Sequence, residues 1–323
     1  MIRQASPEPI VRGFVSGTID STTFRDMRAW GATVVRLQLH PGFTPWPTLL
    51  DSMESDVRAA DAAGLKVVID MHNAPVANPA SSSIWADSTL EPNLIAAWRD
   101  IASRLKPYGQ TIWGYDLLNE PLDYAQLPAA PRQWRPMAIK VVTAIRAIDP
   151  TVWIIYQPGP GGLHDGFTWL MPLPDSRVIY SLHIYDPVVF TMQSFDQAEA
   201  GEPQAPFIHW PGTFPSLDAV LQPAVDFQAR WHVPIYVGEF SVARWAPEPD
   251  GAQWLSAVIS MCESHGWSWT YFAFREHNAW SLEDDDQYWS RPDADPQPAT
   301  TPSIRALTVR AALTSPPAPW RAP

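Results

Sequence analysis

The amino-acid sequence predicts an α/β protein of the (β/α)₈ barrel class, folded as a single domain. Three features predict it: eight short apolar runs, amphipathic stretches between them, and an even composition along the 323 residues. Runs that stay apolar almost to their C-terminal ends are typical of parallel strands covered on both faces. A doubly wound open sheet is the rival architecture, but the sequence lacks the Gly-rich phosphate turn of that class.

The predicted elements alternate along the whole chain. The strands are rich in β-branched and aromatic residues and occupy 10–15, 33–39, 66–71, 112–118, 152–156, 178–183, 235–240 and 269–274. Residues with helical apolar spacing occupy 49–63, 93–105, 137–148, 217–231, 252–265 and 304–313. Gly64 and Gly266 follow two of these helices, where a glycine C-cap is common. The pattern indicates repeated strand–helix units.

The barrel is expected to span residues 1–314, followed by a Pro-rich tail at 315–323. Two connections, 186–215 and 275–302, are longer than ordinary loops. They follow the sixth and eighth strands and leave the C-terminal ends of those strands, the face on which barrel active sites lie. We therefore expect both long loops to border the functional site.

Composition excludes several classes of partner. The formal charge of −12 argues against binding to nucleic acid or an anionic membrane, because both attract basic patches. No apolar run reaches the roughly 20 residues that a membrane helix needs. The single cysteine, Cys262, lies in an apolar stretch, so it predicts a buried, inert thiol and no internal disulfide. We expect a monomer.

The cellular location stays open at this point. The first nine residues contain no apolar segment of the kind found in signal peptides. We expect a secreted or periplasmic protein if a signal peptide has been removed, and a cytoplasmic one otherwise.

Tryptophan is far more frequent than usual, with 17 residues. Because the ring is large, one core is not expected to hide them all, and several should line a cleft. Sugars stack their axial C–H faces on such rings. The candidate platforms are Trp46, Trp85, Trp210, Trp245, Trp280 and Trp289, with core or loop packing as the alternative for each.

Polar side chains gather where the apolar runs end. In a barrel all these ends converge on one rim, so residues distant in sequence form one site. A charge inside a buried strand is costly unless it is paired. The residues in question are Arg36, Asp70, His72, Asn73, Asn119, Glu120, His183, Tyr185 and Glu239.

Two of these residues, Glu120 and Glu239, suit glycoside hydrolysis. That reaction uses one protonated carboxyl to assist the leaving oxygen and one ionised carboxylate, with pKa values held apart by their surroundings. Arg36 is placed to keep a nearby carboxylate ionised, and Tyr185 can donate a hydrogen bond to the same group.

The remaining rim residues suit supporting roles. Asn119 is placed to hold a sugar 2-hydroxyl. His72 and His183 can donate hydrogen bonds to sugar hydroxyls or to the acid. Asp70 is expected to be structural and to orient Arg36 or His72.

The chain resembles glycoside hydrolase family 5, the cellulase-type members of the 4/7 superfamily of barrel glycosidases, from about residue 12 to about 276. The resemblance is carried by Arg36, His72-Asn73, Asn119-Glu120-Pro121, His183-Ile184-Tyr185 and Gly238-Glu239-Phe240. It implies that Glu120 is the acid/base, that Glu239 is the nucleophile, and that configuration is retained through a covalent glycosyl-enzyme. The two carboxyl groups should then lie about 5 Å apart, whereas about 9 Å would indicate inversion.

One position departs from the family pattern. The family usually has a tryptophan near the end of the eighth strand that forms the floor of the −1 subsite, and Phe272 stands at the equivalent position here. Either Phe272 takes over this role or a tryptophan of the last long loop, such as Trp280, enters the site.

No metal or cofactor is expected at the site. The eight histidines show no spacing that would place two on one helix face, and only His72 and His183 end strands. The acidic run 283–286 is expected to be a solvated loop, with a calcium site as the alternative.

The sequence thus predicts a retaining O-glycosyl hydrolase that acts on β-linked glucan, as an endo-β-1,4-glucanase does. The alternatives are an exo-acting β-glucosidase, a β-mannanase or another β-glycosidase of this fold, a metal-dependent hydrolase, or a non-catalytic carbohydrate-binding barrel. Endo or exo action stays open, because the two aromatic loops either block one end of the cleft, which we favour, or extend an open groove.

Overall fold

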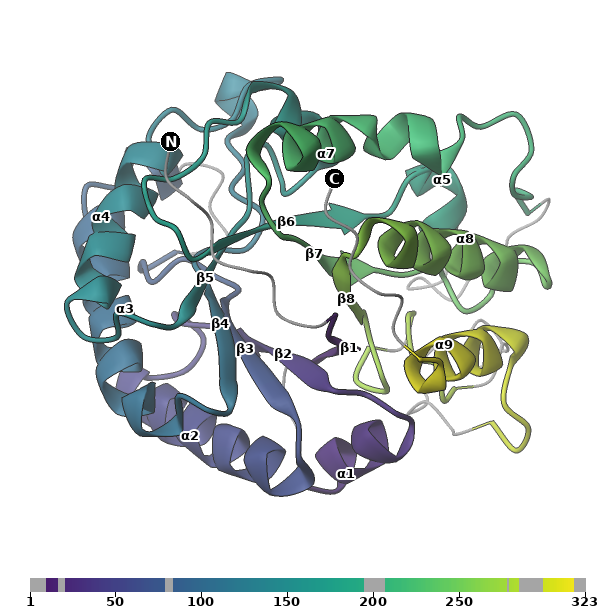
Figure 1. Ribbon diagram of the computed structural model, residues 1–323, viewed down its shortest axis with the longest axis horizontal. Helices are drawn as coiled ribbons and strands as arrows, with labels where there is room; N and C mark the ends of the chain where they lie inside the picture. Colours follow the sequence, from purple (N-terminus) through teal and green to yellow (C-terminus); the bar gives the residue numbers. More distant parts are fainter. Residues whose placement is uncertain are drawn as a thin grey trace.

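The computed structural model describes residues 10–16, 21–78, 84–194, 207–277, 279–284 and 299–316. Within them, eight parallel strands form a closed barrel in chain order, β1 to β8, and β1 pairs with β8 to complete the ring. Figure 1 shows the helices arranged around these strands. The predicted (β/α)₈ barrel is confirmed, and the open doubly wound sheet is excluded because the first and last strands are hydrogen-bonded.

All eight predicted strands are present, with ends displaced by a few residues at most sites. They are β1 (Arg12–Ser16), β2 (Val34–Leu39), β3 (Lys66–Met71), β4 (Ile112–Asp116), β5 (Trp153–Tyr156), β6 (Val178–Ile184), β7 (Ile235–Phe240) and β8 (Ser268–Tyr271). Nearly every strand residue is buried, the expected state for strands covered by helices on one face and by the barrel interior on the other.

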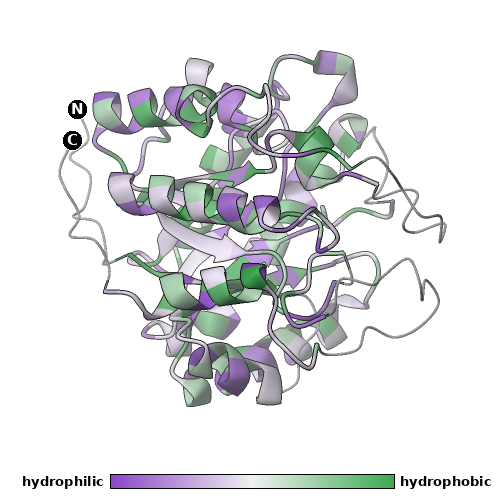
Figure 2. Cartoon of the chain, turned by 90° about the vertical axis from the view of Figure 1, so that its right-hand side faces the viewer, coloured by the Kyte–Doolittle hydropathy of each residue, from purple (hydrophilic) through white to green (hydrophobic). Residues whose placement is uncertain are grey.

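The six predicted helices are also present. The α-helices are α1 (Ser21–Ala29), α2 (Trp46–Ala63), α3 (Leu90–Leu105), α4 (Trp134–Arg146), α5 (Val188–Thr191), α7 (Leu217–Trp231), α8 (Asp250–His265) and α9 (Ile304–Thr314). Helices α2 and α8 end at Gly64 and Gly266 in the left-handed conformation, as the glycine signals predicted. Figure 2 shows that the outer helices carry both hydrophilic and hydrophobic residues, as amphipathic helices do.

Two connections differ from the predicted pattern. Helix α1 was not predicted, because its nine residues bury only Thr23, Phe24 and Met27 and give a short apolar signal. Between β5 and β6 a 3₁₀ helix, η4 (His164–Trp169), packs against α7, with the rings of Phe167 and Phe227 5.4 Å apart. The glycines and prolines of segment 158–162 disfavour an α-helix there.

Much of the tryptophan belongs to the core. Trp98, Trp134, Trp254, Trp267 and Trp269 are among the largest fully buried side chains. Cys262 is buried as well, as predicted, and burial raises the pKa of its thiol, which suits an inert thiol. Among the described residues, no helix is long and apolar enough to cross a membrane.

A buried arginine joins the first strand to the last helices. Arg12 on β1 donates from Nε and Nη2 to the two carboxylate oxygens of Glu263 on α8, at 2.7 and 2.6 Å. Its Nη1 donates to the main-chain oxygen of Ala312 on α9, at 3.1 Å. The contact fastens α8 and α9 to the N-terminal end of β1. Residues 317–323 of the predicted tail lie outside the described residues.

Candidate active site

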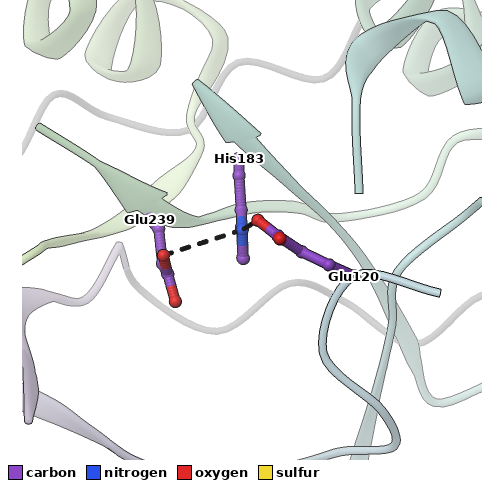
Figure 3. A group of neighbouring side chains, drawn as sticks. All are labelled: Glu120, His183 and Glu239. Carbon is purple, nitrogen blue, oxygen red and sulfur yellow. Dashed lines mark hydrogen bonds and ion pairs between the residues drawn. The ribbon is translucent and has the colours of Figure 1, made fainter. Parts of the chain in front are cut away.

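The rim residues predicted from the sequence meet at the C-terminal ends of the strands. Ligand atoms of Glu120, His183 and Glu239 all lie within 4.8 Å of one another, and Figure 3 shows the three side chains converging from separate segments. One oxygen of each carboxylate therefore lies within 4.8 Å of the other, a close approach that suits a retaining pair and falls well short of the about 9 Å of an inverting pair.

Glu239, near the end of β7, is nearly buried and firmly held. Its Oε1 accepts a hydrogen bond from Arg36 Nη1 at 2.7 Å, and its Oε2 accepts one from the Tyr185 hydroxyl at 2.9 Å. The preceding residue is Gly238, where a Cβ would crowd the site, at 3.0 Å from Nε2 of His183 and 2.9 Å from Oγ of Ser181. The β7 backbone can thus approach the His183 ring closely.

Arg36 lies at the centre of an acidic cluster and has no solvent exposure. Its guanidinium also contacts Asp70 Oδ1 at 3.0 Å and Asp116 Oδ2 at 2.9 Å, and donates to Asn119 Oδ1 at 2.9 Å. Burial alone would lower the pKa of Arg36, but the surrounding carboxylates raise it well above its ordinary value. One permanent cation therefore serves three carboxylates.

The same contacts fix the charge of Glu239. Burial favours the neutral acid, but the positive charges of His183 and Arg36 outweigh it and lower the pKa of Glu239 to about 2. The carboxylate is ionised at any pH in which the protein is expected to work, as a nucleophile requires.

Glu120 stands in a different setting. It lies four residues beyond Asp116, the last residue of β4 that pairs with β5. Of its side chain 42 % is exposed, against 6 % for Glu239. Its Oε1 lies 2.6 Å from Nδ1 of the buried His183. Burial lowers the pKa of His183, but the carboxylates of Glu239 and Glu120 raise it above its ordinary value.

Asp70 has the supporting role predicted for it, and it serves both expected partners. One oxygen pairs with Arg36, and the other lies 2.8 Å from Nδ1 of His72. The orientation leaves Nε2 as the nitrogen of His72 that is available to a ligand. Asn73 is engaged elsewhere, since its Oδ1 lies 2.6 Å from Nδ1 of His40.

Two buried residues of the site were missed in the sequence. Asp116 ends β4 and holds Arg36, and Gln157 follows β5 and contacts both Asp116 and the backbone of Glu120. Asp116 is the last residue of one apolar strand, and Gln157 directly follows another. A polar residue in or beside an apolar strand is the feature that identified Arg36, and both positions share it.

The aromatic candidates separate into two groups. Phe272 follows β8 and is half-buried, and the ring of Trp280 lies 6.1 Å from that of Tyr185, which holds Glu239. Trp280 is only 4 % exposed, so Phe272 is the more accessible of these two rings. Trp245 belongs to the same small cluster, but it is 3 % exposed and its Nε1 donates to the main-chain oxygen of Gln193. The expectation that Trp245 offers an open face to a sugar is corrected: the ring packs the loops together.

The structure does not bring Trp210 to the site. It lies on the outside of the barrel, in a pocket with Leu217 of α7 and Met261 of α8. Its main-chain nitrogen donates to Asp250 at the start of α8. The prediction of a platform at Trp210 was wrong because a long loop following a strand can fold back over the outer helices.

The other sequence candidates are held by contacts of their own or lie outside the described residues. Trp85 donates to the main-chain oxygen of Leu122, and Trp46 donates to Asp100. Glu283, at the start of the acidic run, is paired with Arg275. Trp289 and residues 285–286 lie outside the described residues, so a calcium site there stays a prediction.

Comparisons with known proteins found a matching family model and named relatives. The family model for cellulases of glycosyl hydrolase family 5 matches residues 8–278. "Endoglucanase C" of Acetivibrio thermocellus is 24 % identical over 239 residues, which cover 64 % of this chain and 68 % of the relative. The "Major extracellular endoglucanase" of Xanthomonas campestris is 25 % identical over 248 residues, covering 69 % of this chain and 47 % of the relative.

Solved structures show the same fold. One described as an endoglucanase superimposes with a TM-score of 0.74 at 20 % identity, and the match covers 94 % of this chain and 97 % of the other.

Proposed function

This chain belongs to glycosyl hydrolase family 5 and is a retaining glycoside hydrolase of the cellulase type, and we propose that it cleaves β-1,4-linked glucan within the chain. We assign Glu239 as the nucleophile and Glu120 as the acid/base. The observation that carries the assignment is a pair of carboxylates within 4.8 Å whose surroundings differ in charge and exposure. The endoglucanase names of the relatives support the choice of substrate.

In the first step, an oxygen of Glu239 attacks the anomeric carbon while Glu120 gives its proton to the glycosidic oxygen. The carbon–oxygen bond to the leaving sugar breaks as the bond to Glu239 forms. Arg36 and Tyr185 keep Glu239 ionised and fix its oxygens, which limits the motion that the attack requires.

In the second step, water attacks the same carbon from the side that the leaving sugar has vacated. Glu120 takes a proton from this water, and the bond to Glu239 breaks, so the configuration is retained overall. The contact between His183 and Glu120 orients the carboxyl group that performs both proton transfers.

The surrounding residues suit the binding of a sugar in the −1 subsite. Asn119 accepts from Arg36 through Oδ1, so its amide nitrogen can donate to a sugar 2-hydroxyl. Nε2 of His72 offers a second polar contact. Phe272, which packs against the buried cluster that contains Trp280, supplies the apolar wall in place of the tryptophan usual in the family.

We place the working protein outside the cell, since one relative is named an extracellular endoglucanase. Its substrate is insoluble or polymeric, which also favours a secreted enzyme. The net charge of −12 suits a neutral sugar polymer. We propose that the protein acts as a monomer without a cofactor.

The decisive experiment compares the wild type with Glu239→Ala on cello-oligosaccharides and carboxymethyl cellulose. The variant should lose hydrolysis by roughly 10⁴-fold or more while still binding cellotetraose, because only the nucleophile is removed. Turnover near that of the wild type would refute the assignment. Proton NMR of the first wild-type product should show the β-anomer.

Product analysis decides between the proposed activity and its alternatives. An endo-acting enzyme lowers the viscosity of carboxymethyl cellulose early and releases mixed oligosaccharides. Release of glucose alone would indicate the exo-acting β-glucosidase, and faster cleavage of β-mannan would indicate a mannanase. A wild type that binds cellotetraose but cleaves no glycoside would indicate a non-catalytic barrel.

A further inference from the structure

A buried glutamine connects the two halves of the proposed site. Gln157 directly follows β5 and has no solvent exposure. Its Nε2 donates to Asp116 Oδ2 at 2.9 Å, and its Oε1 accepts from the main-chain N–H of Glu120 at 3.0 Å. Its own main-chain oxygen accepts from Nε1 of Trp134 at 2.8 Å. Both ends of the amide and the backbone behind it are therefore fixed.

The backbone that Gln157 holds is in an unusual conformation. Glu120 has φ of 45°, in the left-handed region that residues other than glycine seldom adopt. His232 also has a positive φ, but it forms the C-cap of α7, where this conformation is common. Glu120 is in no helix, so its conformation depends on contacts from neighbouring segments.

The conformation of Glu120 decides where its carboxyl group points. The N–H that bonds to Gln157 belongs to the residue itself, one bond from the Cα that carries the side chain. A rotation about this backbone bond would move the carboxyl group away from His183 and from the glycosidic oxygen. Gly162 leaves room for the side chain of Gln157, because a Cβ at Gly162 would lie 2.9 Å from its Oε1.

Asp116 determines the orientation of the side-chain amide of Gln157. Its Oδ2 already accepts from Nε of Arg36 at 3.0 Å, so it presents an acceptor to Gln157. The amide must then turn its nitrogen toward Asp116 and its oxygen toward Glu120. The cluster around Arg36, which keeps Glu239 ionised, thereby also orients Gln157, which holds the backbone of Glu120.

We propose that Gln157 is a positioning residue for acid catalysis, which fixes the backbone of Glu120 so that its carboxyl group meets the leaving oxygen. This inference rests on the proposed function, in which Glu120 is the acid/base. Gln157 touches neither substrate nor the reacting atoms and acts through Glu120. Its loss should therefore impair proton donation and spare the attack by Glu239.

The leaving group of the substrate separates these two effects. Phenyl β-cellobioside needs a proton on its leaving oxygen, whereas 2,4-dinitrophenyl β-cellobioside leaves without one. In Gln157→Met, which keeps the size and removes both hydrogen bonds, kcat/KM for the phenyl glycoside should fall roughly 10- to 100-fold. For the dinitrophenyl glycoside, kcat/KM should stay within about 3-fold, since general acid catalysis adds little there.

Gln228→Met is the matched control. Gln228 is 4 % exposed, and its amide accepts from Nε1 of Trp267 and donates to the main-chain oxygen of His265, beside the N-terminal end of β8. The control loses the same kinds of hydrogen bond far along the barrel from Glu120. Its kcat/KM values for the two glycosides should change by one common factor.

The outcome depends on the ratio of the two kcat/KM values, measured on protein whose fold is verified by circular dichroism and thermal melting. A ratio in Gln157→Met that shifts toward the ratio in Glu120→Ala supports the inference. Equal losses on both glycosides, or no loss, overturn it. A wild type that cleaves neither glycoside would instead overturn the proposed function.

Discussion

The barrel contains a buried arginine near each end, and the two are paired in opposite ways. At the N-terminal end, Arg12 meets one carboxylate, Glu263, and main-chain oxygens of the last helix. At the C-terminal end, Arg36 meets three carboxylates, Asp70, Asp116 and Glu239. The first cluster is neutral as a unit, whereas the second carries an excess of negative charge.

The difference indicates that the ion pair of Arg12 stabilises the fold, whereas the cluster around Arg36 serves the proposed active site. A neutral bidentate pair satisfies its own charge and fastens α8 and α9 to β1. A buried excess of carboxylates raises the free energy of the folded state, and Asp116 shows the strain: burial raises its pKa to about 6 although Arg36 opposes this. Such an arrangement is typical of functional sites, where titration matters more than stability.

The largest effect is expected at the acidic end, in Arg36→Lys. A lysine keeps the positive charge, but its donors all sit on one nitrogen. It cannot reach Asp116, Asn119 and Glu239 from three separate nitrogens, as Nε, Nη2 and Nη1 of Arg36 do. We expect kcat/KM on cello-oligosaccharides to fall roughly 100- to 1,000-fold, a loss of about 3 to 4 kcal/mol of transition-state stabilisation. Steady-state kinetics on folded protein measure it, and an activity within a few-fold of the wild type would contradict the role of Arg36.

The same variant should change the pH dependence in a defined direction. In the wild type the pKa of Glu239 is lowered to about 2, so its contribution to stability is present above the ordinary value of 4.5 and is lost as the pH falls toward 2. Weakening Arg36 raises this pKa. The acidic limb of kcat/KM against pH should move upward, and an unchanged limb would show that Arg36 does not set the charge.

A stability effect of intermediate size is expected at the other end, in Arg12→Met. The change leaves the largely buried Glu263 without its cation and frees the oxygen of Ala312. The free energy of unfolding should drop by about 3 kcal/mol, with kcat/KM unchanged at temperatures where the variant is folded. Urea unfolding and kinetics at 25 °C test it together. A loss of activity in the folded variant would contradict the claim that the Arg12 ion pair serves stability and not catalysis.

The smallest effect is expected in Tyr185→Phe. It removes a single hydrogen bond to Oε2 of Glu239 and leaves the bond from Arg36 in place. Because the acceptor is charged, we expect a loss of about 1.5 to 3 kcal/mol, or roughly 10- to 100-fold in kcat/KM. Thermal melting should stay close to that of the wild type. A loss larger than in Arg36→Lys would reverse the order of the two partners of Glu239.

The sequence predicted the strands well because each is covered on both faces, which demands nearly continuous apolar residues. Helix α7 was predicted with its observed ends, 217–231, since its apolar spacing is regular. The short helix α1 and the 3₁₀ helix η4 were missed, because few residues of α1 face the core and glycine interrupts the segment before η4.

Arg36 and Glu239 were predictable, since a charge stands out in an apolar strand. Asp116 was nevertheless missed, although it ends such a strand. Gln157 was missed because an uncharged amide beside a strand end does not stand out. The placement of aromatic residues was the least predictable. Trp245 and Trp210 both lie in loops, and whether a loop ring faces the cleft, the loop core or the outer helices depends on contacts far away in sequence.

The closed order of the strands has a consequence for how the site is assembled during synthesis. Arg36 and Asp116 are 80 residues apart, so this pair leaves the ribosome early, whereas Glu239 follows Arg36 by 203 residues. At roughly 5–20 residues per second, that delay is about 10 to 40 s. The supporting charges are thus made first and the proposed nucleophile long after them. A nascent chain released before β7 is made contains Arg36 and its earlier partners but lacks the proposed nucleophile, so it is not expected to cleave a glycoside.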